Sequence, residues 1–310
     1  MFEKNLLTAS YTDEKIRSLQ PAIDKKKLLF LCEMGLDPGI DHMSAMQLIH
    51  HIQAVGGTIT SFISHCGGLV APESDDNPWH YKISWNPRNV VMAGKAGAVY
   101  RQDGAAKKID YENLFDGGRL TTIPGLGSLA FYPNRDSLPY IPVYGLEHAI
   151  NFMRTTLRYP AFCDGWKHIV ELGLTSETLF YDTGNLSLKD FFEQHFTTQG
   201  FTDTVHDRML QSTAFSDQLH CLGIADSKTM INKGRCSSMD ILQFALEQKL
   251  VLQPVDKDMI VMLHEVTYQL HEKKYLVRSS LLVKGDDNLR TAMAKTVGLP
   301  LGIAAKLILQ

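Results

Sequence analysis

The sequence is poor in cysteine, and the spacing of its few cysteines pairs none of them. Five cysteines occur in 310 residues, at positions 32, 66, 163, 221 and 236, and no Cys-x-x-Cys pair is among them. An odd number without such spacing indicates neither a disulfide framework nor a zinc site. We therefore expect a protein of the reducing cytoplasm.

The sequence also lacks a large charge of one sign and a long apolar run. The net charge is −3, which gives no footprint for nucleic acid, and no Lys/Arg run suggests a membrane surface. No apolar segment is expected to reach the ~18 residues of a spanning helix. The N-terminus lacks the order of a signal peptide. With 44% hydrophobic and 21% charged residues, the composition is that of a soluble globular protein with room for two domains.

The glycine-rich turn of dinucleotide-binding domains is missing as well. No Gly-x-Gly-x-x-Gly follows any predicted strand, so a complete dinucleotide-binding half is absent. Residues 5–11 have the pattern of the end of a buried strand, and a helix is expected from about 13 to 19. A strand this close to residue 1 predicts that the chain enters in the middle of a sheet.

Apolar periodicity predicts an α/β (α+β) protein with a mixed sheet and an α-helical insertion. The predicted strands are 27–33, 58–65, 90–92, 98–101, 107–110, 120–123, 129–132 and 151–159, and later a hairpin of 259–271 and 274–284 that turns at Glu272-Lys273. The predicted helices are 42–54, 162–172, 188–196, 204–212 and 239–250. Residues 70–88 form a long irregular loop, a type that is often functional. The final segment, 289–310, is apolar at helical spacing and is expected to break near Gly298 and Pro300.

The stretch 33–43 is the most promising site. It lies between a predicted strand and a predicted helix, the layout that places ligands at the carboxyl end of a strand in α/β proteins. Gly35 and Gly39 permit backbone angles closed to other residues, and Asp41 is placed to cap the helix. Two interpretations are open: a capped turn, and a ligand site that uses Asp37.

Two arginines, Arg135 and Arg158, stand at the ends of predicted strands. A guanidinium group grips a carboxylate through two parallel hydrogen bonds, so both are candidates for holding an anionic ligand. Arg135 has an alternative role, because the adjacent Asp136 is able to pair with it and fix the loop.

Cys66 precedes two glycines at a predicted strand end. It is either a reactive thiol or a small buried residue, and the buried interpretation is favoured because the neighbouring His65 points to the other side of the strand. Asp37, Asp41 and His42 supply too few ligands for a metal site. A cap and a loop carboxylate explain them, and no metal is predicted.

Several short motifs occur in a fixed order along nearly the whole chain. They are Thr8 to Tyr11, Glu33 to His42, Ser64 to Leu69 with Ala71-Pro72-Glu73, Asp76-Asn77-Pro78, Tyr81 to Trp85, Tyr132 to Ser137, Thr156 to Tyr159, the hairpin that contains Glu265, and Ala292 to Gly298. In this order and at this spacing, the sequence resembles the saccharopine dehydrogenase (glutamate-forming) family, also called saccharopine reductase.

The resemblance implies an oxidoreductase that interconverts saccharopine with glutamate and 2-aminoadipate 6-semialdehyde in lysine metabolism, using NADP or NAD. It implies substrate contacts for Ser10, Tyr11, Asp37, Arg135, Thr156, Leu157 and Arg158. It implies cofactor contacts for Leu36, Asp37 and Pro38. The reaction passes through an imine, so an acid–base group is needed, and the candidates for catalysis are Asp37, Cys66 and Tyr11.

The family's plan divides the chain into four parts. Residues 1–30 are the remnant of a Rossmann-type cofactor domain, 31–159 with 255–288 the substrate-binding domain, 160–254 an α-helical subdomain, and 289–310 a helix that returns to the cofactor domain. Val70 and Trp79-His80 depart from the family's pattern. Without the Rossmann half, we expect this chain alone to bind NADP or NAD poorly.

The expected partners are a small substrate with several carboxylates, a separate Rossmann-domain chain, and a second copy in a homodimer. Neither nucleic acid nor a membrane is expected. Two alternative functions are open: a module that binds a multi-carboxylate ligand without chemistry, and a related imine reductase of the carboxynorspermidine dehydrogenase type. The sequence does not choose between NADP and NAD.

Overall fold

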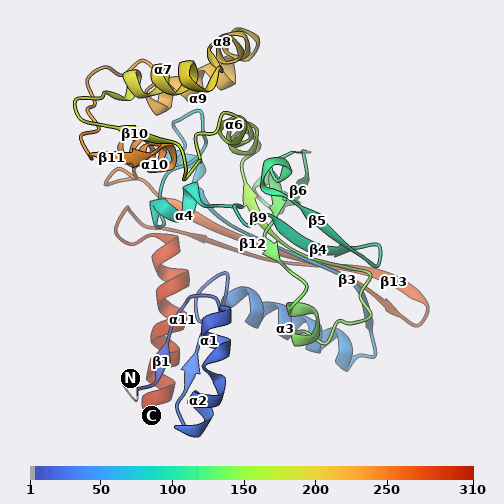
Figure 1. The fold of residues 1–310 in the computed structure, drawn as a ribbon. Helices are drawn as coiled ribbons and strands as arrows, with labels where there is room; N and C mark the ends of the chain where they lie inside the picture. The colour runs from blue at the N-terminus through green and yellow to red at the C-terminus, as the bar shows by residue number, and fades with distance from the viewer. Residues whose placement is uncertain (1–3, 117) are drawn as a thin grey trace.

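The computed structural model describes residues 4–116 and 118–310, and its largest element is a nine-stranded mixed sheet (Figure 1). Neighbouring strands follow the order β13-β12-β3-β9-β4-β5, while β7 pairs with β9, β6 with β7 and β8 with β4. The strands are β3 (Thr58–Val70), β4 (Ala98–Gln102), β5 (Ala105–Ile109), β6 (Leu120–Ile123), β7 (Gly127–Pro133), β8 (Arg135–Asp136), β9 (Asn151–Arg158), β12 (Asp258–Leu270) and β13 (Lys273–Lys284). The predicted α/β class with a mixed sheet is confirmed.

Strand β3 joins the parallel and antiparallel parts of the sheet. Its Cys66 lies beside Thr156 of the parallel strand β9 and beside Met262 of the antiparallel strand β12. Residues paired across a ladder project to the same face, so these three side chains share one face of the sheet. The predicted strand 58–65 is too short, because β3 continues to Val70 and Cys66 lies inside it.

Glycine explains why the strand was expected to end at Cys66, and the structure shows why glycine is needed there. A Cβ atom on Gly67 would lie 2.6 Å from the carbonyl oxygen of Leu157 and 2.7 Å from its Cβ atom. Gly67 therefore permits a close approach of β3 to β9, a recognised reason for glycine inside a strand.

Strands β12 and β13 form the predicted hairpin at one edge of the sheet. Its two-residue turn lies at His271 and Glu272, one residue earlier than predicted, and both residues have positive φ, 48° and 63°. Turns of this hand match the twist of paired strands. The outer edge of β13 has no strand partner among the described residues.

Helix α3 (Ile40–Ala54) covers one face of the sheet and packs against Phe62, Phe152 and Val266. The strand predicted at 90–92 is wrong, because these residues lie in or next to the helix α4 (Pro87–Val91). Proline at the first helical position and the Asn86 side-chain cap, which accepts a hydrogen bond from the Arg88 N–H, outweigh the strand preference of two valines. The shorter helices nearby are η1 (Pro72–Ser74), η2 (Tyr111–Asn113) and α5 (Tyr140–Val143).

A separate group of helices stands above the sheet in Figure 1. They are α6 (Pro160–Glu171), α7 (Leu188–Gln199), α8 (Thr202–Gln211), α9 (Thr213–Leu222) and α10 (Ser238–Lys249), with a small sheet of β10 (Phe180–Asp182) and β11 (Arg235–Ser237). The four helices predicted here are present, whereas α9 and the small sheet were missed. Ser212 is the C-cap of α8 and also the N-cap of α9. Because no loop separates the two helices, no loop signal marks the start of α9.

The N-terminal segment forms a small lobe beside the last helix (Figure 1). Strand β1 (Leu6–Leu7) pairs in parallel with β2 (Phe30–Leu31), and α1 (Glu14–Ser18) and α2 (Gln20–Lys25) connect them. The longer strands predicted at 5–11 and 27–33 are wrong, because each of these strands finds only the other as a partner in the described chain. The helix predicted at about 13–19 is present as α1, whereas α2, which follows it directly after Leu19, was missed.

Helix α11 (Ala292–Leu309) is continuous, so the break predicted near Pro300 is wrong. Proline removes one backbone hydrogen bond, and the helix continues on both sides of it. The expectation that no segment reaches the length of a membrane span is also corrected. By length and composition α11 is such a candidate, with a mean hydropathy of 1.5 and 17% of its residues buried.

The first turn of α11 is anchored to the sheet by Asp258, at the start of β12. Its carboxylate accepts hydrogen bonds from the backbone N–H groups of Ala292 at 2.5 Å and Met293 at 2.9 Å. Asp258 is fully buried. The four-part domain division stays a prediction, and the first three residues of its first part lie outside the described residues.

Candidate functional site

The candidate site begins at the tight turn that leads from β2 into α3. The N–H of Gly35 donates to the carbonyl oxygen of Pro38, and the N–H of Ile40 donates back to Gly35. Gly39 has a φ of 148°, and a Cβ atom on it would lie 2.0 Å from the Gly35 oxygen, so only glycine fits. This turn holds Asp37 at its tip, with 15% of the side chain exposed.

Arg154, on β9, donates hydrogen bonds to both acidic side chains of this turn. Its Nη2 atom donates to Oδ1 of Asp37 at 2.5 Å, to Oδ2 of Asp41 at 2.7 Å and to the Tyr11 hydroxyl at 3.2 Å. The Tyr11 hydroxyl in turn donates to Oδ1 of Asp37 at 2.5 Å. Arg154 is only 2% exposed, so the cluster is a desolvated ionic centre that joins four segments of the chain.

Arg154 was not predicted as a site residue. The available signal was alternation, because Arg154, Thr156 and Arg158 lie two residues apart and share one face of β9. The expectation that Asp41 caps the free N–H groups of α3 is not met, because α3 has no side-chain cap; Oδ1 of Asp41 instead accepts a hydrogen bond from the N–H of Gly39, the residue before the helix, at 2.7 Å. The use of Asp37 as a ligand site stays a prediction.

Burial sets the protonation of three groups around this centre. Burial and the nearby Asp37 charge raise the pKa of Asp41, and the same two causes raise the pKa of Tyr11 well above its usual value. Burial also raises the pKa of the Cys66 thiol, again assisted by Asp37. Tyr11 and Cys66 therefore stay protonated at neutral pH and are available only as proton donors.

A second polar group connects the N-terminal lobe to α3 and α5. The Glu33 carboxylate accepts a hydrogen bond from the Thr12 N–H at 3.0 Å and lies 3.0 Å from Nε2 of His42. The His42 ring stacks on Tyr140 at a centroid distance of 4.9 Å, and its Nδ1 lies 2.5 Å from the Tyr144 hydroxyl. No local pattern predicted this arrangement, in which His42 connects Glu33 with Tyr140 and Tyr144.

Replacing Glu33 with glutamine is expected to make the free energy of unfolding depend less on pH under acidic conditions. Burial alone would raise the pKa of Glu33, but the contacts with His42 and Thr12 outweigh it and lower the pKa to about 2. A lowered pKa stabilises the folded state above the unfolded pKa near 4.5, and this stabilisation is lost as the pH falls from about 4.5 to 2. The carboxylate is partly screened by water, so we expect the free energy of unfolding of Glu33→Gln at pH 7 to be about 2–3 kcal/mol lower than that of the wild type.

Urea unfolding of the wild type and of Glu33→Gln between pH 2 and pH 7 checks this expectation. The wild type should lose stability through this range more steeply than the variant. Glu73→Gln is a matched control, because Glu73 pairs with Lys284 at the exposed surface and should change the profile little. An unchanged acid slope in Glu33→Gln would contradict the assignment.

The two predicted arginines have no carboxylate within 4.0 Å in the described part of the chain. Arg135 lies over the Tyr11 ring, 5.0 Å from its centroid. The alternative pairing with Asp136 is not seen, since that carboxylate accepts the Leu138 N–H at 2.9 Å. Arg158 donates only to carbonyl oxygens, at 2.9 Å to Leu157 and 3.5 Å to Gly68, and its Nε is buried without a partner.

The remaining predicted residues are placed unequally. Ser10 is exposed, and its carbonyl accepts the Glu33 N–H at 3.0 Å. Thr156 faces the site beside Cys66. The side chains of Leu36, Pro38 and Leu157 are buried: Leu36 packs with Cys66 in the core, and Leu157 packs into a cluster on the other face. For Leu36 and Leu157, only backbone atoms are available to a ligand.

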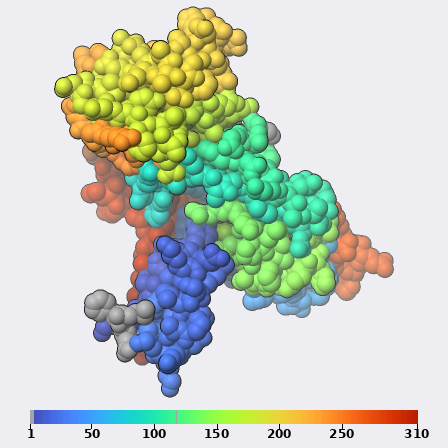
Figure 2. All heavy atoms as spheres, viewed as in Figure 1, coloured from blue at the N-terminus to red at the C-terminus, as the bar shows by residue number. Residues whose placement is uncertain are grey.

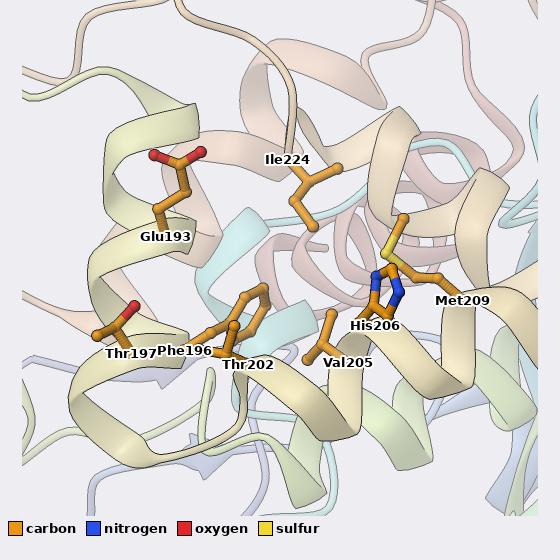
Figure 3. A pocket seen from close by; sticks show the side chains of 8 residues that line it. All are labelled: Glu193, Phe196, Thr197, Thr202, Val205, His206, Met209 and Ile224. Atoms are coloured by element: carbon orange, nitrogen blue, oxygen red, sulfur yellow. The ribbon is translucent and has the colours of Figure 1, made fainter.

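The site lies between the N-terminal lobe and the sheet, where Figure 2 shows the surface hollowed between the blue segment and the teal and green ones. A separate depression of about 340 Å³ lies among α7, α8 and Ile224, far along the chain from Asp37 (Figure 3). None of the predicted site residues lines that depression. No group of three or more His, Cys, Asp or Glu able to hold a metal ion occurs in residues 4–116 and 118–310.

Comparisons with known proteins agree on one family. The family model described as the saccharopine dehydrogenase C-terminal domain matches residues 35–310. The bovine protein named alpha-aminoadipic semialdehyde synthase, mitochondrial (Bos taurus), is 34% identical over an alignment 319 residues long, which covers 98% of this chain and 34% of that protein. The protein named saccharopine dehydrogenase [NADP(+), L-glutamate-forming] of Schizosaccharomyces pombe is 32% identical, over 99% of this chain and 71% of that protein.

A solved structure of a protein with the same family name is also similar to this chain. Apo histidine-tagged saccharopine dehydrogenase (L-Glu forming) from Saccharomyces cerevisiae superposes with a TM-score of 0.85 at 29% identity, over 98% of this chain and 71% of that one. The chain thus spans about a third of the bovine relative's length and about seven-tenths of the yeast proteins' length.

Proposed function

Because the chain belongs to the saccharopine dehydrogenase family, whose C-terminal domain it matches over residues 35–310, we propose that its site binds saccharopine. The reaction proposed for the site is the interconversion of saccharopine with glutamate and 2-aminoadipate 6-semialdehyde in lysine metabolism. The relatives named for this reaction are longer than this chain, and their names support the proposal.

One observation carries the proposal, the arrangement of charge. Asp41, which is buried, and Asp37, which is partly buried, share one cation, Arg154, while Arg135 and Arg158 stand without a carboxylate partner in the described chain. Arg135 is exposed, but Arg158 is partly buried and its Nε is fully buried without a partner. A cation buried in this way is costly and indicates that a ligand supplies the missing anion.

The spacing of these charges suits a long ligand with a central amine. Arg158 lies four strand residues from Arg154 on the same face of β9, which is about 13 Å. Arg135 lies at the Arg154 end, over Tyr11. Saccharopine has carboxylates at both ends and a secondary ammonium between them, so its ends suit the two arginines and its ammonium suits the acidic pair.

The roles proposed for the predicted catalytic residues follow from their protonation. Asp37 accepts the proton of the substrate ammonium, and Tyr11, whose raised pKa keeps it a phenol, donates a hydrogen bond to Asp37. Cys66 is a thiol on the site face and is available to donate a proton, although its burial makes it a poor nucleophile.

NADP or NAD would supply or accept the hydride. The residues present fit this cofactor poorly: the side chains of Leu36 and Pro38 are buried, and no glycine-rich turn offers N–H groups to a pyrophosphate. We derive no step through the cofactor. We propose instead that a nucleotide-binding domain, on this polypeptide or on another, completes the site.

The exposed face of α11 supports this proposal. Leu299, Ile303 and Leu307 lie four residues apart on one stripe and are 61%, 59% and 67% exposed. The stripe belongs to the lobe that contains the short parallel pair β1 and β2, to which further parallel strands of an α/β domain are able to add. We therefore propose that a protein domain, rather than a membrane, covers this face.

Calorimetry tests the proposed function on the 310-residue chain. We expect saccharopine to bind without nucleotide, with a Kd of about 1 µM to 1 mM, the range usual for enzyme substrates. Glutamate, which offers only one end of the ligand, should bind more weakly, and NADPH should give no measurable heat. Absence of saccharopine binding, or tighter binding of carboxynorspermidine, would replace this proposal.

Location and assembly also stay predictions. The five cysteines are free in the structure, which supports the expected cytoplasmic location. The unpaired edge of β13, with Leu276 57% and Leu282 44% exposed, offers a surface for the expected homodimer.

A further inference from the structure

We infer that Arg154 is a positioning residue for Asp37 and that it makes Oδ2 the proton-accepting oxygen of that carboxylate. The inference rests on the proposed function, because the proton accepted is that of the substrate ammonium. Oδ1 of Asp37 receives two hydrogen bonds, from Arg154 and from the Tyr11 hydroxyl, each at 2.5 Å. No hydrogen bond reaches Oδ2 from any described residue, and the side chain is 15% exposed.

Arg154 itself is poorly placed to bind a ligand. Its Nη2 atom already serves the oxygens of Asp37, Asp41 and Tyr11. The faces of its guanidinium group lie near two aromatic rings, with centroid distances of 4.6 Å to Tyr140 and 5.5 Å to Tyr11. With 2% of its surface exposed, it acts on the ligand through Asp37.

The two acids have different positions and different partners. Asp41 is 2% exposed; its Oδ2 accepts a hydrogen bond from Arg154, and its Oδ1 accepts one from the Gly39 N–H in the turn. Arg154, fixed in this way, turns Asp37 so that one oxygen is saturated and the other is free. In the proton transfer, the N–H bond of the substrate ammonium breaks and an O–H bond forms at Oδ2, which leaves a neutral amine and a neutral carboxylic acid.

A simpler alternative is that Arg154 only balances the charge of two buried acids. The two cases separate in a charge-matched comparison of the wild type, in which Arg154 faces two carboxylates, with the double variant Arg154→Met/Asp41→Asn, which keeps one carboxylate and no cation. If Arg154 positions Asp37, the double variant should bind saccharopine at least about tenfold more weakly than the wild type, since a charge-assisted hydrogen bond is lost. If Arg154 only balances charge, the double variant and the wild type should bind alike, and the inference is refuted.

A cycle with Asp37→Asn shows whether the effect passes through Asp37. Adding Asp37→Asn to both backgrounds should abolish the difference between them, because the oriented carboxylate is then absent from both. A tenfold difference that persists without the Asp37 carboxylate would overturn the inference. Circular dichroism checks that each variant folds; if the double variant does not, Arg154→Lys takes its place in the same cycle, since lysine keeps the charge without the planar fork.

A failure of the proposed function is distinguishable from a failure of this inference. If the wild-type chain binds no saccharopine, the proposed function fails, and crystal structures of Asp41→Asn and of the double variant decide the role of Arg154. A carboxylate of Asp37 that rotates when Arg154 is removed supports positioning. The same orientation in both structures refutes it.

Discussion

Replacing Arg158 with methionine is expected to stabilise the ligand-free protein and, at the same time, to weaken saccharopine binding by at least about tenfold. The guanidinium of Arg158 is packed near the rings of Tyr81 and Phe162, at 5.5 and 5.3 Å from their centroids, and its hydrogen-bond partners among the described residues are carbonyl oxygens. A buried charge without a counter-charge costs several kcal/mol, and methionine fills similar space without that cost. We expect a gain of about 1–3 kcal/mol in the free energy of unfolding.

Urea unfolding and calorimetry on the same preparations measure the two effects. Arg101→Met is a matched control, because Arg101 also donates only to backbone carbonyl oxygens, those of Glu147 and Ala149, and lies outside the site. The control should leave saccharopine binding unchanged and should not stabilise the protein. The role of Arg158 as a carboxylate ligand is wrong if its methionine variant is destabilised and binds saccharopine as the wild type does.

The largest loss of stability is expected from Lys82→Met, at about 3–5 kcal/mol. Lys82 is 4% exposed, and its Nζ donates to Asp256 at 2.6 Å and to Asp76 at 2.9 Å. Desolvation lowers the pKa of Lys82, but the two carboxylates outweigh it and raise the pKa, so the amine stays charged. Without it, the buried carboxylate of Asp256 is left unpaired.

The double variant Lys82→Met/Asp256→Asn should recover most of this loss, since it removes the stranded charge as well. Lys189→Met is the surface control: its pair with Glu193 is exposed on α7 and should be worth less than about 1 kcal/mol. Equal losses in Lys82→Met and in the double variant would show that packing of the lysine stem, and not its charge, stabilises this region.

Local patterns predicted the fold well where they were long. Four of the five helices described in the 160–254 region, all but α9, and the β12–β13 hairpin follow from periodicities of 3.6 and 2. Short or interrupted patterns failed. Two valines of α4 predict a strand, although Pro87 and Asn86 start a helix there. Gly67 predicts a strand end, although it permits a close approach of two strands.

The site was predicted in part for a related reason. Asp37 and Tyr11 belong to recognisable motifs, but their contact joins residues 26 apart, and Arg154 lies 117 residues from Asp37. That contact depends on the register of β9 against β3, which no local pattern contains. Cys66 was placed near the site and its burial was favoured from the sequence, whereas the contribution of Asp37 to the raised pKa of its thiol becomes visible only once the fold is known.

Helix α11 is attached to the sheet at its first turn, so a change of its tilt moves its far end most. Asp258 fixes its first turn to β12, the strand that also carries Met262 beside Cys66, while the apolar stripe lies further along the helix. Eighteen residues span about 27 Å, so a tilt of about 5° at the fixed end displaces the far end by about 2 Å. A domain seated on the stripe would therefore have its distance from Asp37 governed by the first turns of α11, which Asp258 holds by two hydrogen bonds and which pack on the sheet through Met293 and Val297.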